Sequence, residues 1–517
     1  MKNITSEQLS AIKSMAAAKK EEILNSKSLY SCDGTVYYVN SENGNDDNDG
    51  LSPETAFKTT AKVSDIALNV GDTVLFCRGM VFRGLLKTQP GVTYSAYGEG
   101  KKPEIYGSIS ASDPKDWEKT EYPDVWRYRE PIHFSLDIGA IFMKNESLWG
   151  IKVCVNTFQG ERCDMGENWN CDVYNGRRWV HRERSKWNGI ADLKGDLEFY
   201  HDWQSGYLYL CCADGNPAEA FGTVEMTQRV SIIRPKVWAQ KDVTIDNLCF
   251  KYGNFGISGF GDSTNFTVRN CVFGCIGGSS QFVEKYMNND DNIPYGKDVT
   301  RLGNGIEVYG VCKNMLVENC YFYQNYDAAV TVQVSYKTLD RDRIMDGITW
   351  KNNLFDTCHY PFELWLYSPE DTGEFRAAMV DVDISENIAL NTGFGFGHTR
   401  RDPGDCFLYS GYEGAANCEF INCKMHNNIL FSARTSNYRG KNVGPQGILF
   451  TENKIFSNAP TIARTSEYFT FRDGAFTSHK LNEENLQKMF DSGIWDKSNE
   501  YYTLDKELST FEGKLEI

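Results

Sequence analysis

An asparagine recurs through the second half of the chain, each time between two short segments of alternating apolar and polar residues. Two copies read Phe-Thr-Val-Arg-Asn270-Cys-Val-Phe and Met-Leu-Val-Glu-Asn319-Cys-Tyr-Phe. Alternation of this kind indicates β-strands with one buried face. Self-similarity at a period of roughly 20–50 residues is the signature of a repeat architecture. The anchoring residues are Asn247, Asn270, Asn319, Asn352, Asn387, Asn422 and Asn453.

The unequal spacing of these asparagines predicts stacked coils with turns of different length. A coil of about two dozen residues lets the chain climb one strand spacing, roughly 4.8 Å, per turn. We therefore expect a right-handed parallel β-helix over 236–470, with asparagine amides laddered from coil to coil at one corner. Cys271, Cys320 and Cys423 follow an anchor directly, so we expect them to form an inward stack of small apolar thiols.

The N-terminal part is expected to hold a helix, a cap and the first coils. Residues 1–34 carry apolar side chains at helical spacing and predict an N-terminal helix. Residues 35–112 combine short strand-like segments with a helix that Ser52 and Pro53 would begin and that would end before Gly71. We interpret this stretch as the N-terminal cap and the first coils of the β-helix.

Two further segments do not follow the repeat. Residues 113–235 are rich in tryptophan and in short strand-like runs, and we expect an inserted β-sandwich-like domain there. Residues 471–517 show helical spacing around 483–490 and are expected to cap the last coil, which would otherwise expose a strand edge. The fold class predicted for the whole chain is therefore all-β, a right-handed parallel β-helix with an inserted β-sandwich-like domain and helical caps.

The charge balance argues against polyanionic partners. Lys plus Arg number 54 against 70 Asp plus Glu, which gives a net charge of −16. A nucleic-acid backbone or an anionic membrane would be repelled on average, so a neutral substrate suits the chain better. The N-terminal segment lacks the apolar run of a signal peptide, and we expect a cytoplasmic protein. Long β-helices often trimerise, and the sequence leaves a homo-oligomer open.

No cofactor or metal is expected. The 16 cysteines contain no CxxC pair and are interpreted as reduced, mostly buried thiols. Asn45, Asp47 and Asp49 before Gly50 are similar to the start of a calcium loop, but the glutamate that should follow is absent and Ala56 stands near its place. A polar capping loop is the favoured interpretation.

Long inserted loops point to a functional face, because solenoids accept insertions at their turns and use them to build clefts. The insertions at 275–303 and 334–346 flank strands that carry Glu307, Asp327 and Glu363. In Gly-Ile-Glu307-Val-Tyr the glutamate alternates with core residues and is expected to point outward, and Glu363 follows the same pattern. We therefore predict a cleft lined by these three acids.

The chemistry of such a cleft fits glycoside hydrolysis. That reaction uses two carboxyl groups about 5 Å apart for retention or roughly 6.5–9.5 Å apart for inversion, and the three acids can supply either spacing. Tyr309 and Trp365 are expected to stack on sugar rings. The simpler alternative is a polar outer face on which the acids meet solvent.

Three basic or neutral residues complete the candidate site. Counted from its anchor, His398 falls on the same stack as Glu363, where it would contact substrate or act as a structural donor. Arg400 and Arg401 could bind the carboxylate of a uronate. Pairing of these arginines with Asp402 and Asp405 is the favoured alternative.

The opening segment Gly44-Asn-Asp-Asp-Asn-Asp-Gly-Leu-Ser-Pro-Glu-Thr-Ala-Phe-Lys-Thr59, followed by Gly71-Asp-Thr-Val-Leu-Phe76, resembles that of the pectate-lyase-like β-helix proteins. The expected inserted domain is similar to the β-xylosidase-type branch of their glycoside hydrolases. That resemblance implies retention, with Asp327 as nucleophile, Glu363 as acid/base and Glu307 orienting the substrate. It requires a bend at Tyr326–Asp327; without one, Glu307 becomes the better partner of Glu363.

Two other functions stay open. A polysaccharide lyase acting on uronate-containing glycans would need a Lys, Arg or Tyr base, with Arg400, Arg401 and His398 as candidates. A non-catalytic carbohydrate-binding β-helix is the third reading. The leading hypothesis is an exo-acting hydrolase that removes xylose or a similar pyranose from plant-type oligosaccharides.

Overall fold

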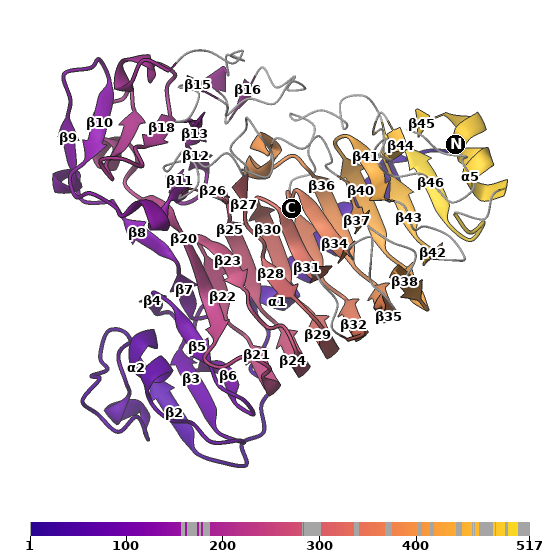
Figure 1. Ribbon diagram of the computed structural model, residues 1–517, viewed down its shortest axis with the longest axis horizontal. Coiled ribbons are helices and arrows are strands. Elements are labelled where there is room, and N and C mark those ends of the chain that lie inside the picture. Colours follow the sequence, from indigo (N-terminus) through magenta and orange to yellow (C-terminus); the bar gives the residue numbers. More distant parts are fainter. Residues whose placement is uncertain are drawn as a thin grey trace.

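Three long sheets run side by side along the molecule and form the three walls of a solenoid (Figure 1). The computed structural model describes residues 2–156, 161–162, 173–174, 177–178, 187–281, 283, 301–335, 341–367, 375–400, 406–413, 418–440, 447–457, 459, 461–464, 479–480, 482–491, 495–504 and 517. Side chains are described for most of these residues.

Each wall is built from parallel strands contributed by successive coils. The first sheet runs β4 (Val81–Arg83), β7 (Glu104–Tyr106), β22 (Cys249–Lys251), β25 (Val272–Ile276), β30 (Tyr321–Asn325), β33 (Leu354–Asp356), β36 (Ile388–Thr392), β40 (Ile429–Ala433), β43 (Lys454–Phe456), β46 (Glu500–Thr503) and β1 (Lys2–Asn3). The second runs β2 (Val36–Val39), β3 (Thr73–Cys77), β6 (Thr93–Tyr97), β21 (Lys241–Asp246), β24 (Ser263–Arg269), β29 (Cys312–Glu318), β32 (Arg343–Lys351), β35 (Ala377–Ser385), β39 (Cys423–His426) and β42 (Ile448–Thr451), with β38 (Cys418–Ile421) also on β35.

The third sheet, here called the site sheet, starts in the inserted segment and continues along the coils. It runs β12 (Leu148–Trp149), β11 (Ile138–Met143), β20 (Val224–Pro235), β23 (Gly253–Ile257), β28 (Ile306–Tyr309), β31 (Ala328–Ser335), β34 (Tyr360–Tyr367), β37 (Leu408–Glu413), β41 (Ser436–Gly440), β44 (Thr461–Arg464) and β45 (His479–Lys480), with β5 (Leu86–Thr88) and β8 (Ser108–Ser110) on β20.

One coil visits the three sheets in turn. From β24 the chain passes to β25, then to β28 in the site sheet, and returns to the second sheet as β29, which pairs in parallel with β24. The next coil repeats the path through β30, β31 and β32. The predicted fold class is confirmed: the chain is a parallel β-helix, right-handed as parallel crossovers almost always are.

Inward side chains of neighbouring coils stack on one another and form the core. The rings of Phe250, Phe273, Phe322 and Phe355 follow one another at centroid distances of 5.0, 4.8 and 5.0 Å. Their repetition follows from the parallel register, which places the same position of each coil directly above its predecessor. The alternation seen in the sequence is thus the inside–outside alternation of each wall.

The corner between the second and first sheets holds two adjacent asparagine positions with different roles. The residues with the left-handed backbone that turns the corner include Asn270, Asn319 and Asn352, with φ of 55°, 51° and 56°. Asparagine tolerates this conformation better than most residues. The amide ladder forms one residue later, and its members are Asn353, Asn387, Asn428, Asn453 and Asn499.

This separation corrects part of the predicted alignment. Asn387 aligns with Asn353 rather than with Asn352, and Asn422 lies outside the ladder because Asn428 occupies its place. Cys271 and Cys320 do stack, with the Cys271 amide donating to the Cys320 sulfur at 3.4 Å. Cys423 does not join them, since it begins β39 and pairs with Ile448.

Helix α1 (Ser6–Leu24) lies along the outer face of the first sheet and does not cap an end. Its buried Ile12, Ala16 and Ile23 pack on side chains such as Tyr321 and Leu354. Its 19 residues reach about 28 Å at 1.5 Å per residue, enough to cross several strands. The capping role belongs to α2 (Thr60–Asp65) and α5 (Glu483–Asp491), whose apolar side chains join the core.

The helix expected from Ser52 to Gly71 is two separate pieces. Ser52 caps a short 3₁₀ turn, η1 (Pro53–Thr55), and α2 begins only after a second N-cap at Thr59. Between them Phe57 enters the core, and its backbone bonds to Tyr38. The extended backbone at Ala56 and Phe57 therefore interrupts the helix.

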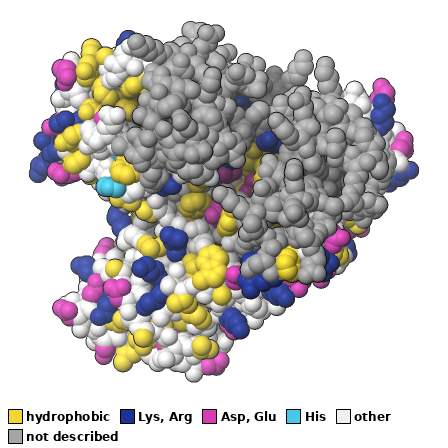
Figure 2. Space-filling view, viewed as in Figure 1, with side chains coloured by type: hydrophobic (Ala, Val, Ile, Leu, Met, Phe, Trp, Pro, Cys, Tyr) yellow, Lys and Arg dark blue, Asp and Glu magenta, His cyan; other side chains and the backbone are white. Residues whose placement is uncertain are grey.

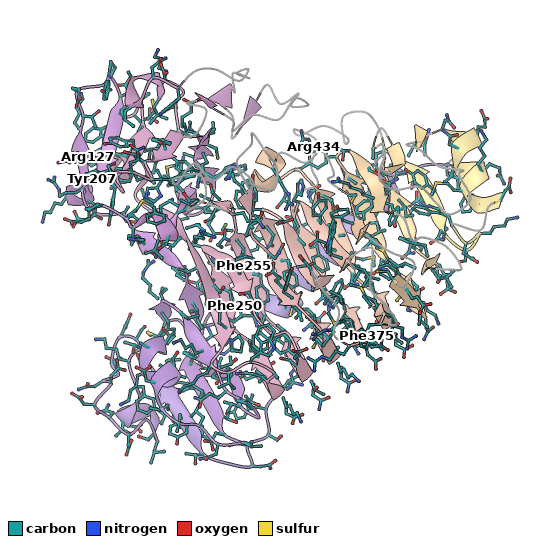
Figure 3. All side chains as sticks on the ribbon, viewed as in Figure 1. Arg127, Tyr207, Phe250, Phe255, Phe375 and Arg434 are labelled. Carbon is teal, nitrogen blue, oxygen red and sulfur yellow. The ribbon has the colours of Figure 1, made fainter. Side chains whose placement is uncertain are left out.

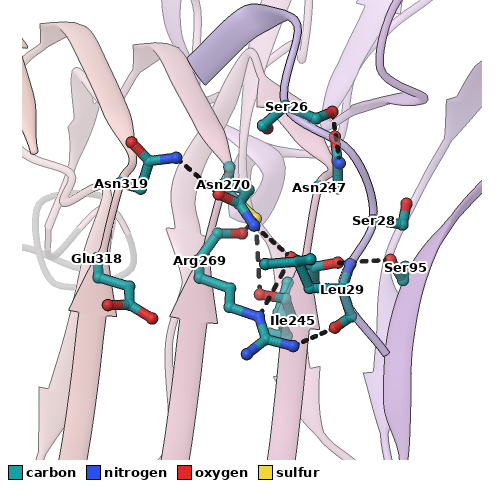
Figure 4. Close-up of polar contacts among 12 residues, drawn as sticks. Ser26, Ser28, Leu29, Ser95, Ile245, Asn247, Arg269, Asn270, Glu318 and Asn319 are labelled. Carbon is teal, nitrogen blue, oxygen red and sulfur yellow. Dashed lines mark hydrogen bonds and ion pairs between the residues drawn. The ribbon is translucent and has the colours of Figure 1, made fainter. Parts of the chain in front are cut away.

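A linker from α1 crosses the corner of the solenoid and is held there by buried polar groups (Figure 4). The Leu29 amide donates to the fully buried carboxylate of Asp246 at 2.7 Å, and Ser95 donates to the same oxygen at 2.8 Å. Asn270 donates to the other oxygen of Asp246 and accepts from Asn319. This network ties the N-terminal segment to the first coils.

Between β8 and β20 the chain builds a separate small sheet that projects from the solenoid (Figure 1). It consists of β13 (Ile151–Lys152), β18 (Glu198–His201), β19 (Leu208–Cys211), β10 (Val125–Tyr128) and β9 (Trp117–Lys119). Its own apolar cluster includes Trp117, Phe199 and Leu210. On its surface the guanidinium of Arg127 lies 4.3 Å from the ring centre of Tyr207 (Figure 3).

The remaining elements are short. They are α3 (Pro217–Phe221), the 3₁₀ turns η2 (Pro114–Asp116), η3 (Phe134–Leu136), η4 (Ile190–Asp192) and η5 (Phe396–Thr399), and the strand pairs β14 (Val155–Asn156) with β15 (Glu161–Arg162), β16 (Val173–Tyr174) with β17 (Arg177–Arg178) and β26 (Ser279–Ser280) with β27 (Arg301–Leu302). In the described part of the chain, no helix is both long and apolar enough to cross a bilayer.

Candidate active site

One register position of the site sheet carries polar and aromatic residues on five consecutive strands. Pairing in parallel places Glu307 beside Thr331, Thr331 beside Glu363, and Glu363 beside Tyr409. Arg439 follows Tyr409 in the same way. Because the neighbouring residues Val308, Val332 and Leu364 belong to the core, this row faces away from it. We call it the acid row.

Glu363 lies at the centre of the acid row and is buried. The Gln333 side-chain amide donates to its carboxylate at 3.2 Å, and the Thr331 hydroxyl is a second donor. Burial raises the pKa of Glu363 to about 7, and the charge of Glu307 adds to the rise against the opposing effects of Thr331, Arg439 and Gln333. A carboxyl with this pKa can hold a proton at neutral pH.

Glu307 lies two strands from Glu363 and has a similar pKa for a related reason. The Asn304 side-chain amide donates to its carboxylate at 2.6 Å, while the oxygen of the same amide accepts from the Ala328 backbone. Burial raises the pKa of Glu307 to about 7 although the Asn304 hydrogen bond lowers it. Two carboxyl groups that can each exchange a proton near neutrality thus share one face.

The structure places Asp327 at a distance from this pair. It precedes β31 and is in register with His359, four residues before Thr331, which corresponds to about 13 Å along a strand. Its carboxylate forms an ion pair with Arg400, and both side chains are largely buried. The bend that would bring Asp327 beside Glu363 is not formed, so the neighbouring acid is Glu307.

Arg400 thus pairs with Asp327, an acid that the sequence placed in the cleft. Its guanidinium also lies 5.7 Å from the ring centre of Tyr360, which begins β34. Asp402 and Asp405, the partners favoured from the sequence, lie outside the described residues, and so does Arg401.

His398 does not occupy the position predicted for it. The residue beside Glu363 on the next strand is Tyr409, whereas His398 belongs to η5, which precedes that strand. More residues separate β36 from β37 than separate β33 from β34 in the coil before. A fixed count of residues from Asn387 therefore ends at His398, before β37 begins. The side chain of His398 lies outside the described residues.

Aromatic side chains cover the acid row on both sides. Trp365 lies in register with Gln333 and Tyr309, and its ring meets that of Tyr409 edge-on at 5.5 Å. Tyr360 lies 5.3 Å from Tyr409 on the other side. Tyr309 is 44% exposed and so presents its ring to solvent.

Sequence reasoning missed four residues of this site: Thr331, Gln333, Tyr409 and Arg439. The guanidinium of Arg439 lies 4.7 Å from the ring centre of Tyr409, so a cation lies in the acid row two strands beyond Glu363. Thr331 and Gln333 alternate with core valines and could have been found by the same alternation that identified Glu307. Tyr409 and Arg439 follow loops of irregular length and carried no comparable signal.

A hollow of about 560 Å³ lies away from the acid row, in the notch between the N-terminal segment and the inserted sheet (Figure 2). Arg83 and Glu225 line it and form a two-point ion pair at 2.7 and 2.9 Å. The only carboxylate lining this hollow is thus bound to an arginine, so we place the chemistry at the acid row instead.

No group of three or more potential metal ligands occurs among the described residues. In the predicted capping loop, Asp49 accepts from the Leu51 amide at 3.0 Å and from the Thr55 hydroxyl at 2.7 Å. Asp46 accepts from the Lys58 and Thr59 amides. These carboxylates stabilise the turn through hydrogen bonds.

No protein-family model matches this chain, and no curated protein sequence matches it significantly. Solved structures are similar at low identity. The complex of XylC with xylose has a TM-score of 0.43 at 12% identity, over 91% of this chain and 83% of that one. A rhamnogalacturonan lyase has 0.38 at 10%, over 90% and 87%. The family 28 exopolygalacturonase of Yersinia enterocolitica has 0.37 at 11%, over 92% and 79%.

These neighbours include hydrolases and a lyase, and none of them shows which reaction this chain performs. The fold assignment rests on the strand ladders of the chain itself. They show a parallel β-helix with three sheets, the fold that the resemblance of the opening segment implied.

Proposed function

We propose that this protein is a carbohydrate-active enzyme, and specifically a glycoside hydrolase that uses Glu363 and Glu307. The observation that carries the proposal is the placement of two carboxyl groups on one outward face, each with its pKa raised to about 7. Paired titratable groups with perturbed pKa values are characteristic of catalytic sites. Tyr309, which is 44% exposed, and Trp365 supply aromatic rings on which sugars can stack.

The spacing of the pair favours inversion. Glu307 and Glu363 are separated by one intervening strand, so their backbones lie about 10 Å apart. Inverting enzymes hold their carboxyl groups roughly 6.5–9.5 Å apart, which leaves room for the attacking water. Protonated Glu363 would give its proton to the leaving oxygen while ionised Glu307 takes one from that water, and the sugar–oxygen bond breaks as the new one forms.

The proposed substrate is a plant-type oligosaccharide, with xylosides as the first candidates because the expected inserted domain resembles that of the β-xylosidase-type branch of β-helix glycoside hydrolases. Asp327, proposed as nucleophile on that resemblance, becomes a positioning residue here, since it is bound to Arg400. Exo action and a cytoplasmic site of action remain part of the proposal.

The test is an activity panel with matched variants. Purified protein is incubated with nitrophenyl glycosides and plant oligosaccharides, and released sugar and ultraviolet absorbance of unsaturated products are followed together. Glu363→Gln and Glu307→Gln should abolish sugar release. Glu318→Gln is the control, because Glu318 lies on a neighbouring wall and pairs with Lys351 at 3.4 Å. Undiminished hydrolysis in Glu363→Gln would rule out the assignment.

A polysaccharide lyase is the second candidate, and the position of Arg439 favours it. This cation lies one strand beyond Tyr409 in the acid row and near enough to Glu363 to lower its pKa. It could neutralise the carboxylate of a uronate while Tyr409, in its ionised form, takes the proton from C5, the C4–O bond breaks and a C4–C5 double bond forms. Unsaturated products in the same assay, lost in Arg439→Gln and retained in Glu307→Gln, would establish this reaction instead.

A further inference from the structure

Trp238 is a large aromatic residue held at the surface in a fixed orientation. It lies in the turn between β20 and β21, and 56% of it is exposed. Its indole N–H donates to the Asp262 carboxylate at 3.0 Å. Large aromatic rings are usually buried. The hydrogen bond to Asp262 instead orients this indole at the surface, which suggests that the exposed ring has a function.

The ring of Trp238 rests on Gly261. A Cβ atom built at Gly261 would lie 2.5 Å from the indole and 2.4 Å from the carbonyl oxygen of Tyr309. Only glycine therefore lets the indole and the Tyr309 backbone approach this closely. The indole thus lies close to Gly261, while 56% of Trp238 stays exposed and accessible to a ligand.

Trp238 continues a line of aromatic residues that borders the acid row. Tyr309, Gln333 and Trp365 share one register position, two residues along the strands from Glu307 and Glu363. Tyr309 and Trp365 are two strand spacings apart, about 10 Å. Trp238 lies in the turn after β20, which is two strands before β28 in the site sheet. It therefore extends the line of aromatic residues by about 10 Å toward the N-terminal end of the solenoid.

An inserted loop reaches the same place. Arg341, at the described end of the insertion between β31 and β32, lies 3.8 Å from the Asp262 carboxylate that holds Trp238. The same Asp262 oxygen accepts from the indole. The Asp262 carboxylate thus joins the loop to the ring, two coils away from the strand where the loop begins.

We propose that Trp238 is a distal sugar-binding platform that, with Tyr309 and Trp365, binds an extended oligosaccharide of several pyranose units. The inference rests on the proposed function and defines its substrate as a chain rather than a single glycoside. The C–H face of a pyranose stacks on an aromatic ring, while Asp262 and Arg341 offer hydrogen bonds to its hydroxyls. The aromatic line and the acid row then bind one glycan chain along the solenoid axis.

The first experiment compares substrates of different length. For Trp238→Ala, KM for the longest hydrolysed oligosaccharide should rise about three- to tenfold, the range for loss of one aromatic contact, with kcat unchanged. KM for the nitrophenyl monosaccharide should stay the same. Val237→Ala is the matched control, since Val237 is 53% exposed in the same turn. Trp238→Phe should restore most of the affinity.

The second experiment is independent of catalysis. Retardation of the protein in native gels that contain soluble xylan or rhamnogalacturonan reports binding directly, and the Trp238→Ala protein should migrate faster than the parent. Equal retardation of parent and variant, or no retardation of the parent by either polysaccharide, overturns the inference. Failure of the proposed function gives a different result: the Glu363→Gln protein would still hydrolyse the substrate, whatever the effect of Trp238→Ala on binding.

Discussion

Glu307 and Glu363 flank Thr331 on three consecutive strands of one sheet, and the charge of Glu307 raises the pKa of Glu363. The relationship is set by the backbone register, because parallel pairing brings equivalent positions of successive coils into line. Its chemical consequence is that the two groups titrate together near neutral pH, where one proton can be shared between them.

The pH dependence of hydrolysis should follow from this sharing. The active form has Glu363 protonated and Glu307 ionised, so the rate should fall above about pH 7 as Glu363 loses its proton and fall below it as Glu307 gains one. The measurement is kcat/KM against pH on the best substrate of the panel. A rate that climbs steadily to pH 9 would contradict a protonated glutamic acid.

Removing the charge of Glu307 should lower the pKa of Glu363. In Glu307→Gln the electrostatic effect on Glu363 disappears, so the pKa of Glu363 should fall, though burial keeps it above the ordinary value. Carbon-13 NMR of labelled glutamate side chains measures this shift in the inactive protein. Glu318→Gln should leave the pKa of Glu363 where it was, and a shift there would indicate a general structural change.

Thr331→Val should have the opposite effect on the pKa of Glu363. The Thr331 hydroxyl stabilises the ionised form of Glu363, and valine removes that hydrogen bond at nearly constant volume. The pKa of Glu363 should therefore rise, and the alkaline limb of the rate profile should move to higher pH. An unchanged alkaline limb would mean that a group other than Glu363 supplies the proton.

Asp327→Asn separates a nucleophile from a positioning residue. A nucleophile is required for every turnover, whereas loss of the ion pair with Arg400 mainly costs stability, on the order of 2 kcal/mol for a largely buried pair. We expect kcat to stay within about tenfold of the parent, well short of the 10²–10⁴-fold expected for loss of an acid or base. Arg400→Met should show a similar loss of stability. Complete inactivation of a well-folded Asp327→Asn protein would restore Asp327 as the catalytic partner.

The positions of the site residues in the structure show which of them the sequence could predict. The alternation around Glu307 and Glu363 placed both on the outer face, because the core residues on either side of each are unambiguous. His398 was misplaced because a count from Asn387 assumes a coil of standard length, and η5 lies in that coil. The contact between Asp327 and Arg400 joins different coils through a loop path, which no local pattern encodes.

The corner between the second and first sheets is another place where a local sequence pattern was not enough to predict the structure. Two neighbouring positions carry asparagine: the first has the left-handed backbone, and its Asn319 donates to Asn270, whereas the longer amide ladder through Asn387 and Asn428 lies one residue later. A single alignment therefore mixed the two sets and included Asn422, which is exposed. Only the pairing of β36 with β40 separates Asn387 and Asn428 from their neighbours.

Stability of the solenoid should depend on the inward asparagines. The side chain of Asn387 donates to Asn428 at 3.0 Å and to the Trp350 carbonyl at 2.9 Å, and it accepts from Asn353. Asn387→Ala would leave buried partners without hydrogen bonds, at about 1–3 kcal/mol for each group. Asn43→Ala is the control, since Asn43 is exposed, and should change the free energy of unfolding by less than about 0.5 kcal/mol. Equal effects of both substitutions in urea unfolding would contradict the stabilising role of the amide ladder.

A buried ion pair in the inserted segment should make stability sensitive to acid. Asp137 and Lys152 are 0% and 2% exposed and lie 2.5 Å apart, and Trp203 and the Ser280 amide also donate to Asp137. Although burial alone would raise it, the pKa of Asp137 is held well below its usual range by Lys152 and His201. A folded-state pKa below the unfolded value means that this stabilisation is present above about pH 4 and is lost as the pH falls further.

Asp137→Asn should therefore lower the free energy of unfolding at neutral pH by about 3–5 kcal/mol, because Lys152 would remain buried without its counter-charge. The same substitution should reduce the loss of stability between about pH 4 and pH 2, since the group that must be protonated is gone. Thermal unfolding followed across this pH range measures both effects. Asp192→Asn serves as the control, because the nearby Lys194 is 66% exposed and its ion pair is 3.8 Å long. A parent and an Asp137→Asn protein with parallel pH profiles would show that the Asp137 carboxylate does not titrate with folding.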